Sequence, residues 1–176
     1  TVEDYSNAAY TLRVGGDIRF DAVNDITLRN TVEARSASGL EDITLFAQKG
    51  AITQANISAD GALAEPLRAA HLDVQAATGI SLLYTELDSV SATNTGGGSN
   101  AIVIQETAAG GDLHVLLATQ TNVGGAGSIE IGTTMGTLTV DVLGTGVSNL
   151  GHGTITLSSS NGGVATVDGS GAVTGV

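Results

Sequence analysis

The sequence predicts an all-β protein that folds as a right-handed parallel β-helix of about six coils. Two observations carry this prediction: short strand motifs recur with a period near 27 residues, and apolar and polar side chains alternate within each motif. The composition agrees, because 25 glycines and many Thr, Ser, Val and Ile residues accompany a single Pro. With only three Tyr and two Phe, the core must be aliphatic, which suits a narrow, regularly stacked interior.

The period is visible in the first aliphatic residue of each strand motif. Two series of such residues interleave along the chain with a spacing near 27. The first series is Ile18, Ile43, Leu72, Ile102, Ile129 and Ile155, and the second is Ile26, Ile52, Ile80, Leu113, Leu138 and Val164. Members of one series are expected to stack on one another, because equivalent positions of a solenoid meet once per coil.

Alternation within the motifs indicates strands that are buried on one face. The residue two positions after each landmark is apolar in ten of twelve cases, and the residue between is polar in ten of twelve. The best helical candidate, residues 62–70, is interrupted by Pro66. Without crossover helices a βαβ sheet is excluded, and recurrence once per full period favours a coil over an antiparallel sandwich. The right-handed sense follows from the general preference of parallel crossovers.

Three Gly-rich stretches are predicted to be surface loops: residues 91–100, 121–126 and 144–149. If any surface of the protein recognises a partner, the first two loops are the expected place, because a rigid stack of strands would hold them in position. Their candidate partner-binding residues are Thr95, Asn100, Thr121 and Asn122. A glycan or protein on a host or neighbouring cell is the expected kind of partner.

Charge and composition exclude several other partners. The formal net charge is −12, and all six basic residues lie in the first 68 positions, so no nucleic-acid partner is expected. No apolar run reaches the length of a membrane span, so no membrane insertion is expected. The absence of Cys excludes disulfides and thiolate metal sites and is typical of exported bacterial proteins. Residues 1–176 are expected to form a single β-helix segment of a longer chain.

The acidic residues before the first strands suggest one cation site. Asp17 and Asp42 precede consecutive members of the first series, so they are expected in adjacent coils about 5 Å apart. Paired carboxylates attract divalent cations, and calcium is the candidate ligand. The alternative is a solvated, salt-bridged surface, because Arg13, Arg19 and Arg29 are close in sequence. No other cofactor is expected.

The sequence predicts no enzymatic activity. The three histidines, His71, His114 and His152, fall at different places in the two series and are not expected to converge on a metal. Asp73 and Glu130 share one predicted column but are expected to lie two coils apart, whereas polysaccharide hydrolysis needs paired carboxylates. No complete nucleotide-binding or serine-hydrolase motif is present.

Several motifs resemble those of large bacterial exoproteins. They are Gly15–Phe20 (Gly-Gly-Asp-Ile-Arg-Phe), Asn24–Leu28 (Asn-Asp-Ile-Thr-Leu) and Gly110–Val115 (Gly-Gly-Asp-Leu-His-Val). Such motifs are similar to those of filamentous-haemagglutinin-like adhesins, whose shafts are right-handed parallel β-helices. The resemblance covers roughly residues 10–176 and implies secretion, a location on the bacterial surface and an adhesive or spacer role. It supplies no catalytic residues.

A second resemblance covers about the last twenty residues. Ser158–Asn161, Val164–Asp168 and Gly171–Val176 are similar to the closing motif of group 2 bacterial immunoglobulin-like domains. The tryptophan that usually precedes that motif is absent here. The last strands could therefore belong either to a final β-helix coil or to an immunoglobulin-like domain.

Three hypotheses for function follow. The first is a non-enzymatic stalk or loop-presenting scaffold in a large secreted bacterial surface protein. The second is a carbohydrate-active or carbohydrate-binding β-helix of the lyase or tailspike type, which would need a groove with clustered carboxylates, aromatic residues and a Lys or Arg. This sequence is poor in aromatic residues and has no Lys or Arg after Arg68. The third is a filament subunit that associates end to end, because exposed parallel strand edges can pair.

Overall fold

The computed structural model describes residues 12–55, 66–108, 111–141, 146–159, 163–167 and 173–175, and these form β-strands and turns without a helix. The strands are β1 (Leu12–Val14), β2 (Ile18–Ala22), β3 (Ile26–Leu28), β4 (Val32–Ser36), β5 (Gly39–Leu40), β6 (Ile43–Ala47), β7 (Ile52–Gln54), β8 (Leu67–Ala76), β9 (Ile80–Asn94), β10 (Ile102–Glu106), β11 (Leu113–Gln120), β12 (Ile129–Thr133), β13 (Leu138–Val140), β14 (Gly146–Asn149), β15 (Ile155–Ser159), β16 (Gly163–Val167) and β17 (Val173–Gly175). Within these ranges, no helix is present that could cross a membrane.

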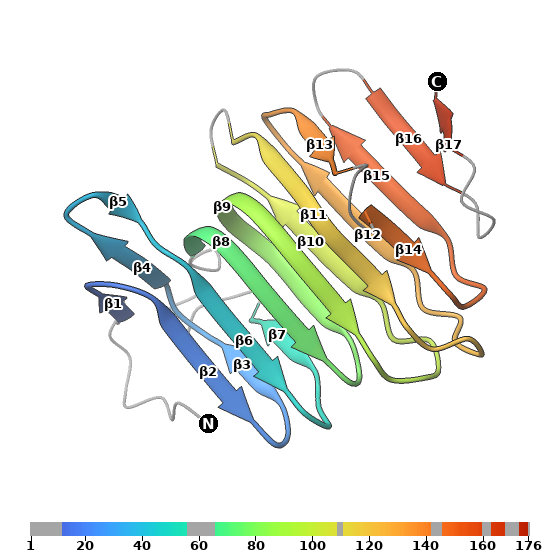
Figure 1. Cartoon of the computed structure of the whole chain (residues 1–176), viewed down its shortest axis with the longest axis horizontal. Helices are drawn as coiled ribbons and strands as arrows, with labels where there is room; N and C mark the ends of the chain where they lie inside the picture. Colours follow the sequence, from blue (N-terminus) through green and yellow to red (C-terminus); the bar gives the residue numbers. More distant parts are fainter. Residues whose placement is uncertain are drawn as a thin grey trace.

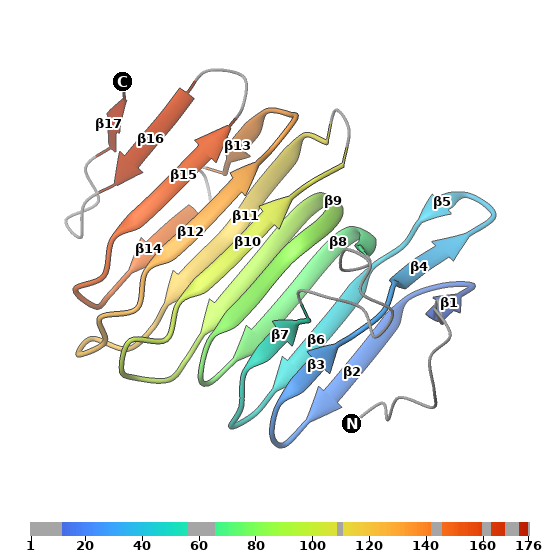
Figure 2. The same ribbon diagram turned by 180° about the vertical axis from the view of Figure 1, so that it is seen from behind.

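The strands lie side by side along the long axis of the molecule, and their colours follow chain order from one end to the other (Figure 1). The opposite view shows the same succession (Figure 2). Nearly all neighbouring strands are parallel, and the chain makes about five turns with a period of about 26 residues. The predicted parallel β-helix is therefore confirmed, with slightly fewer turns than expected. Its right-handed sense stays a prediction from the crossover rule.

One column of strands runs through the whole stack. This column, ladder 1, consists of β3, β7, β9, β10, β12 and β15. It aligns Ile26, Ile52, Ile80, Ile102, Ile129 and Ile155 in one register. Five of these six isoleucines are buried, so each coil covers the aliphatic side chains of the next.

A second column, ladder 2, forms another wall of the coil. It consists of β2, β6, β8, β9, β11 and β14. Ile18, Ile43, Leu72 and Val90 are in register, and an irregularity in β11 between Val115 and Leu117 shifts the pairing that follows. β13 extends this wall by pairing with the first half of β11. A shorter column, ladder 3, consists of β1, β4 and parts of β8 and β9.

The prediction of two unbroken series is wrong at the fourth coil. Leu72 pairs with Val90 instead of Ile102, and Ile80 pairs with Ile102 instead of Leu113. The reason is that β8 and β9, with 10 and 15 residues, continue from one ladder into the next where other coils insert loops. The coil from Leu72 to Val90 is therefore only 18 residues long. An alignment based on a period near 27 joins the wrong strands there.

The end of the chain departs from the β-helix. Val164 was expected to stack above Leu138 in a last coil, but β16 pairs antiparallel with β15 and places Val164 opposite Ser158. β17 in turn pairs antiparallel with β16. Both views show these three strands side by side at the end that carries the C-terminus (Figures 1 and 2). The last predicted β-helix coil is therefore wrong.

The core is aliphatic, as the composition predicts. The largest fully buried side chains are Ile43, Leu45, Ile52, Leu67, Leu72, Ile80, Leu82, Ile102, Ile104, Leu113, Ile129 and Ile131. They lie at alternate strand positions, which confirms the predicted alternation of inward and outward side chains. Phe20 is partly buried and packs against this core.

Candidate functional site

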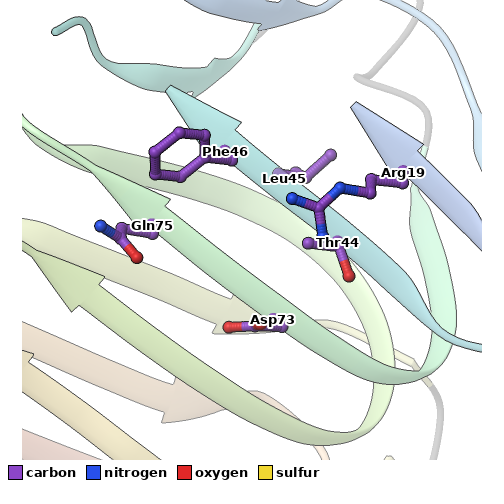
Figure 3. A pocket seen from close by; sticks show the side chains of 6 residues that line it. All are labelled: Arg19, Thr44, Leu45, Phe46, Asp73 and Gln75. Atoms are coloured by element: carbon purple, nitrogen blue, oxygen red, sulfur yellow. The ribbon is translucent and has the colours of Figure 1, made fainter. Parts of the chain in front are cut away.

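The outward face of ladder 2 is hollowed into a shallow groove over β2, β6 and β8. The groove has a volume of about 200 Å³, and Figure 3 shows the side chains that line it. They are Arg19, Thr44, Leu45, Phe46, Asp73 and Gln75. A half-buried aromatic ring thus lies beside a guanidinium, a carboxylate and an amide on an otherwise regular sheet.

The register of ladder 2 brings these side chains together. One outward column consists of Arg19, Thr44 and Asp73, and the column two positions further consists of Asp21, Phe46 and Gln75. Neighbouring strands are about 4.8 Å apart, so the side chains of a column are within reach of one another. Positions separated by 25 to 29 residues in the chain therefore share one small surface.

An ion pair orients the guanidinium at the edge of the groove. Arg19 Nε and Nη2 donate hydrogen bonds to the two carboxylate oxygens of Asp21, at 2.7 and 2.9 Å. The hydrogen bond and the negative charge of Asp21 raise the pKa of Arg19. Asp73 contributes a further negative charge near Arg19. The charged groups of this surface are thus two carboxylates and one guanidinium.

Asp17 and Asp42 lie in adjacent coils, as predicted, but the carboxylate of Asp17 has a structural partner. Its Oδ1 accepts a hydrogen bond from the backbone N–H of Asp42 at 3.2 Å. Within the described ranges, no group of three or more His, Asp or Glu residues could hold a metal ion. Calcium binding by this pair stays a prediction.

The same contact recurs before other strands and explains the Asp of the repeated motif. Asp25 Oδ1 accepts from the N–H of Ala51 at 2.8 Å, and Asp112 Oδ1 accepts from the N–H of Thr137 at 2.7 Å. In each case the donor lies one coil further along the chain. These aspartates therefore connect consecutive coils, a role that requires no ligand.

The four candidate partner-binding residues lie in loops that stack on one another. Thr95 donates its backbone N–H to Ala76 O, and Thr121 repeats this contact with Asn94 O. Asn100 Nδ2 donates to Gly97 O, and Asn122 Oδ1 accepts from Gly124 N. Thr95 and Thr121 are exposed, whereas Asn100 and Asn122 are half-buried.

The predicted loop boundaries need two corrections. Residues 91–94 belong to β9, so the first loop begins only after Asn94, and Gly146–Asn149 is strand β14. Backbone hydrogen bonds from Ala126 to Gly98 O and from His152 to Gly125 O join three successive loops. The loops therefore stack in tiers at one edge of the β-helix, each hydrogen-bonded to the loop of the preceding coil.

Buried Asn and Gln side chains form hydrogen bonds to the backbone of these stacked loops. Asn94 Nδ2 donates to Gln120 Oε1 at 2.7 Å, and both side chains also donate to Asn100 O. One coil further, Asn149 Nδ2 donates to Gly127 O and Gly153 O. These buried amides were not predicted from the sequence. The alternation of buried residues along the strand could have indicated them, because Asn94 follows the buried residues Val90 and Ala92 at steps of two and therefore points inward.

Two of the histidines lie in one column of ladder 2. His71 Nδ1 lies 2.9 Å from Ser89 Oγ, and His114 is the cross-strand neighbour of Ser89 on the next coil. Ser89 therefore separates His71 from His114, and among the described residues neither belongs to a group that could hold a metal ion. Within the described ranges, no carboxylate forms an ion pair with His71, so no Ser-His-Asp arrangement results.

The predicted shared column of Asp73 and Glu130 is also wrong. Asp73 lies in ladder 2, whereas Glu130 lies in ladder 1 between Val103 and Thr156. Glu130 accepts a hydrogen bond from Ser128 Oγ at 2.8 Å. The two carboxylates therefore belong to different ladders of the coil.

Ladder 3 contains a column of alternating charges that the sequence analysis missed. It runs Arg13, Glu33, Arg68 and Glu86 over successive strands. Glu33 is only 1% exposed, and its Oε2 lies 2.9 Å from Arg13 Nε and 4.0 Å from Arg68 Nη1. Burial opposes its ionisation, but the hydrogen bond from Arg35 and the charge of Arg13 lower the pKa of Glu33 overall.

A second buried carboxylate, Glu106 at the end of β10, is the cross-strand neighbour of Thr85 in β9. Glu106 is fully buried, and its two oxygens accept hydrogen bonds from the backbone N–H groups of Leu87 (2.7 Å) and Ala108 (2.8 Å). Thr85 Oγ1 adds a contact at 3.2 Å. Burial raises the pKa of Glu106 despite these hydrogen bonds. The Glu106 carboxylate thus satisfies the backbone N–H of Leu87 in β9.

The sequence matches no protein-family model and no curated protein, and the structure matches no solved structure.

Proposed function

We propose that this chain is a non-enzymatic, rigid scaffold segment of a large secreted bacterial surface protein. The observation that carries the proposal is ladder 1, in which six strands stack in parallel register over buried isoleucines. Each coil supplies part of the core of its neighbours, so no coil can loosen without exposing the next. Such a stack keeps its outer surface and loops at fixed positions.

Three further features support this role. The loops after β9, β11 and β14 are tied into tiers by backbone hydrogen bonds, as a loop-presenting scaffold requires. The chain contains no Cys, which is typical of exported bacterial proteins. The Gly-Gly-Asp and Asn-Asp motifs resemble those of filamentous-haemagglutinin-like adhesins, and in this chain their aspartates connect consecutive coils. A glycan or protein on another cell is the proposed partner.

Single-molecule stretching of the chain between inert handles tests the scaffold role. A scaffold is expected to resist extension and then rupture in one cooperative event. The matched control is Ile129→Asp, which places an unpaired charge in ladder 1 and should remove that event. Gradual extension of the unmodified chain, at forces no greater than the control needs, contradicts the proposal.

End-to-end filament formation is the second candidate function, and the pairing of β16 with β15 argues against it. β16 pairs antiparallel with β15 and occupies the edge on which another parallel strand would add. Addition of a second copy at that edge of ladder 1 would therefore have to displace β16. Sedimentation at increasing protein concentration tests this, because growth of the particle would favour the filament over the scaffold.

A further inference from the structure

The groove over β2, β6 and β8 differs from the rest of the same sheet face. In later coils one of the two outward columns carries only hydroxyl side chains (Thr93, Thr119 and Ser148), and the other carries Ser91, Leu117 and Gly146. Neither column has a charged or aromatic residue there. In the first three coils the same columns carry Arg19, Phe46, Asp73 and Gln75. The fold alone does not require this change, since Thr is well suited to every outward strand position.

The side chains of the groove combine one apolar surface with several planar polar groups. Phe46 is half-buried, whereas Asp73 and Gln75 beside it are exposed, and Arg19 is held in place by Asp21. Figure 3 shows Phe46 and Gln75 on adjacent strands, with Arg19 and Asp73 on either side of Thr44. An aromatic ring next to a few fixed polar groups is the usual composition of a small-ligand site.

A pyranose ring has the complementary chemistry. Its C–H face can lie on an aromatic ring, and its hydroxyl groups can donate to a carboxylate or exchange hydrogen bonds with an amide. The charges of the groove select among sugars: two carboxylates face one guanidinium that is already paired, and the whole chain carries a net charge of −12. Uronates and other acidic sugars are therefore repelled.

We propose that the groove over β2, β6 and β8 binds a neutral glycan, with a pyranose ring on Phe46 and its hydroxyl groups at Asp73 and Gln75. This goes beyond the scaffold role, because it assigns a ligand class and a site to a sheet face instead of the loops.

The test is binding of the intact chain to immobilised hexasaccharides of glucose, mannose, galactose and N-acetylglucosamine, with polygalacturonate as the acidic counterpart. Binding to at least one neutral hexasaccharide is expected. The variant Phe46→Thr, which carries the residue type found two strands later in the same column (Thr93), should weaken binding roughly tenfold. Gln75→Ala should weaken it several-fold.

The matched control is Thr93→Ala, which changes the same column outside the groove and should leave binding unchanged. Circular dichroism of each variant checks that the fold is retained. The proposal is overturned if none of the neutral hexasaccharides binds, if Phe46→Thr binds as well as the unmodified chain, or if polygalacturonate binds more tightly than all of them. None of these results affects the scaffold role, which the stretching experiment tests separately.

Discussion

Glu33 is the buried centre of an ion network, and its loss should be costly. Three arginines, Arg13, Arg35 and Arg68, surround its carboxylate. Glu33→Gln would remove the negative charge that they share, and we expect it to lower the free energy of unfolding by about 2 kcal/mol at pH 7. The exposure of Arg13 and Arg35 keeps the loss at this modest size, because water can solvate their charges.

Urea unfolding at pH 7 measures this loss, and Glu86→Gln is the matched control. Glu86 pairs with Arg68 but is about one-third exposed, so a smaller loss is expected there. The folded state lowers the pKa of Glu33, so its contribution is present above the ordinary value of 4.5 and disappears as the pH falls below it. A Glu33→Gln variant as stable as the control at pH 7 would show that the network contributes little.

Glu106 is expected to respond to pH in the opposite direction. Its pKa is raised in the folded state, so stability is greatest below the ordinary value of 4.5 and is lost as the pH rises through the folded value. Glu106→Gln removes the titration but keeps one acceptor for Leu87 or Ala108. As the pH falls from 8 to 4.5, the unmodified chain should therefore gain stability relative to the variant.

Urea titrations of both proteins across this pH range measure the difference, in which contributions of other groups cancel. Two parallel stability curves would mean that Glu106 does not titrate between these values. The inward orientation of Glu106 could be predicted from the sequence, because it lies two positions after the buried Ile104. Its hydrogen-bond donor Leu87 could not be predicted, because Leu87 lies in the short coil that the periodic alignment skipped.

At the scale of elements, close stacking of turns requires glycine at certain positions. A Cβ at Gly127 would lie 1.9 Å from Asn100 O, a backbone atom of the preceding coil that also accepts two buried amide hydrogen bonds. Gly127→Ala must therefore separate the coils, and we expect a loss of roughly 2–4 kcal/mol in unfolding free energy. The melting temperature measured by circular dichroism should fall accordingly.

Gly124 provides the control in the same loop. A Cβ there would meet only Asn122 Oδ1, at an ordinary contact distance of 3.7 Å. Gly124→Ala should therefore leave the melting temperature nearly unchanged. Equal effects of the two substitutions would mean that the stacking of turns at Gly127 tolerates a side chain.

The elements also show how far the sequence could predict this fold. Strands such as β6, β10 and β12 are short, alternate cleanly and carry an isoleucine at a regular spacing, so periodicity located them. β9 is different, because its 15 residues form part of three ladders without an intervening loop. Periodicity contains no information on a coil that lacks its loops. The groove was missed for a related reason, since Phe46 and Gln75 become neighbours only through the register of β6 and β8.

At the scale of the whole molecule, the antiparallel strand β16 covers the edge of β15 on which a second copy could pair. β15 pairs with β12 on one edge and with β16 on the other. Truncation after Ser159 would expose the backbone N–H and C=O groups of Ile155–Ser159, and such unpaired edges associate readily. We expect the truncated chain to form larger species with rising concentration in sedimentation experiments, whereas the full chain stays monomeric.

A lysine on the exposed edge separates this explanation from general misfolding. Thr156 lies between the buried residues Ile155 and Leu157, so its side chain points outward. Thr156→Lys in the truncated chain should restore the monomer, because a charged side chain on an edge strand opposes pairing with another copy. If the truncated chain is monomeric without the lysine, β16 is not what keeps the edge of ladder 1 from pairing. If association persists with the lysine, the contact lies elsewhere on the stack.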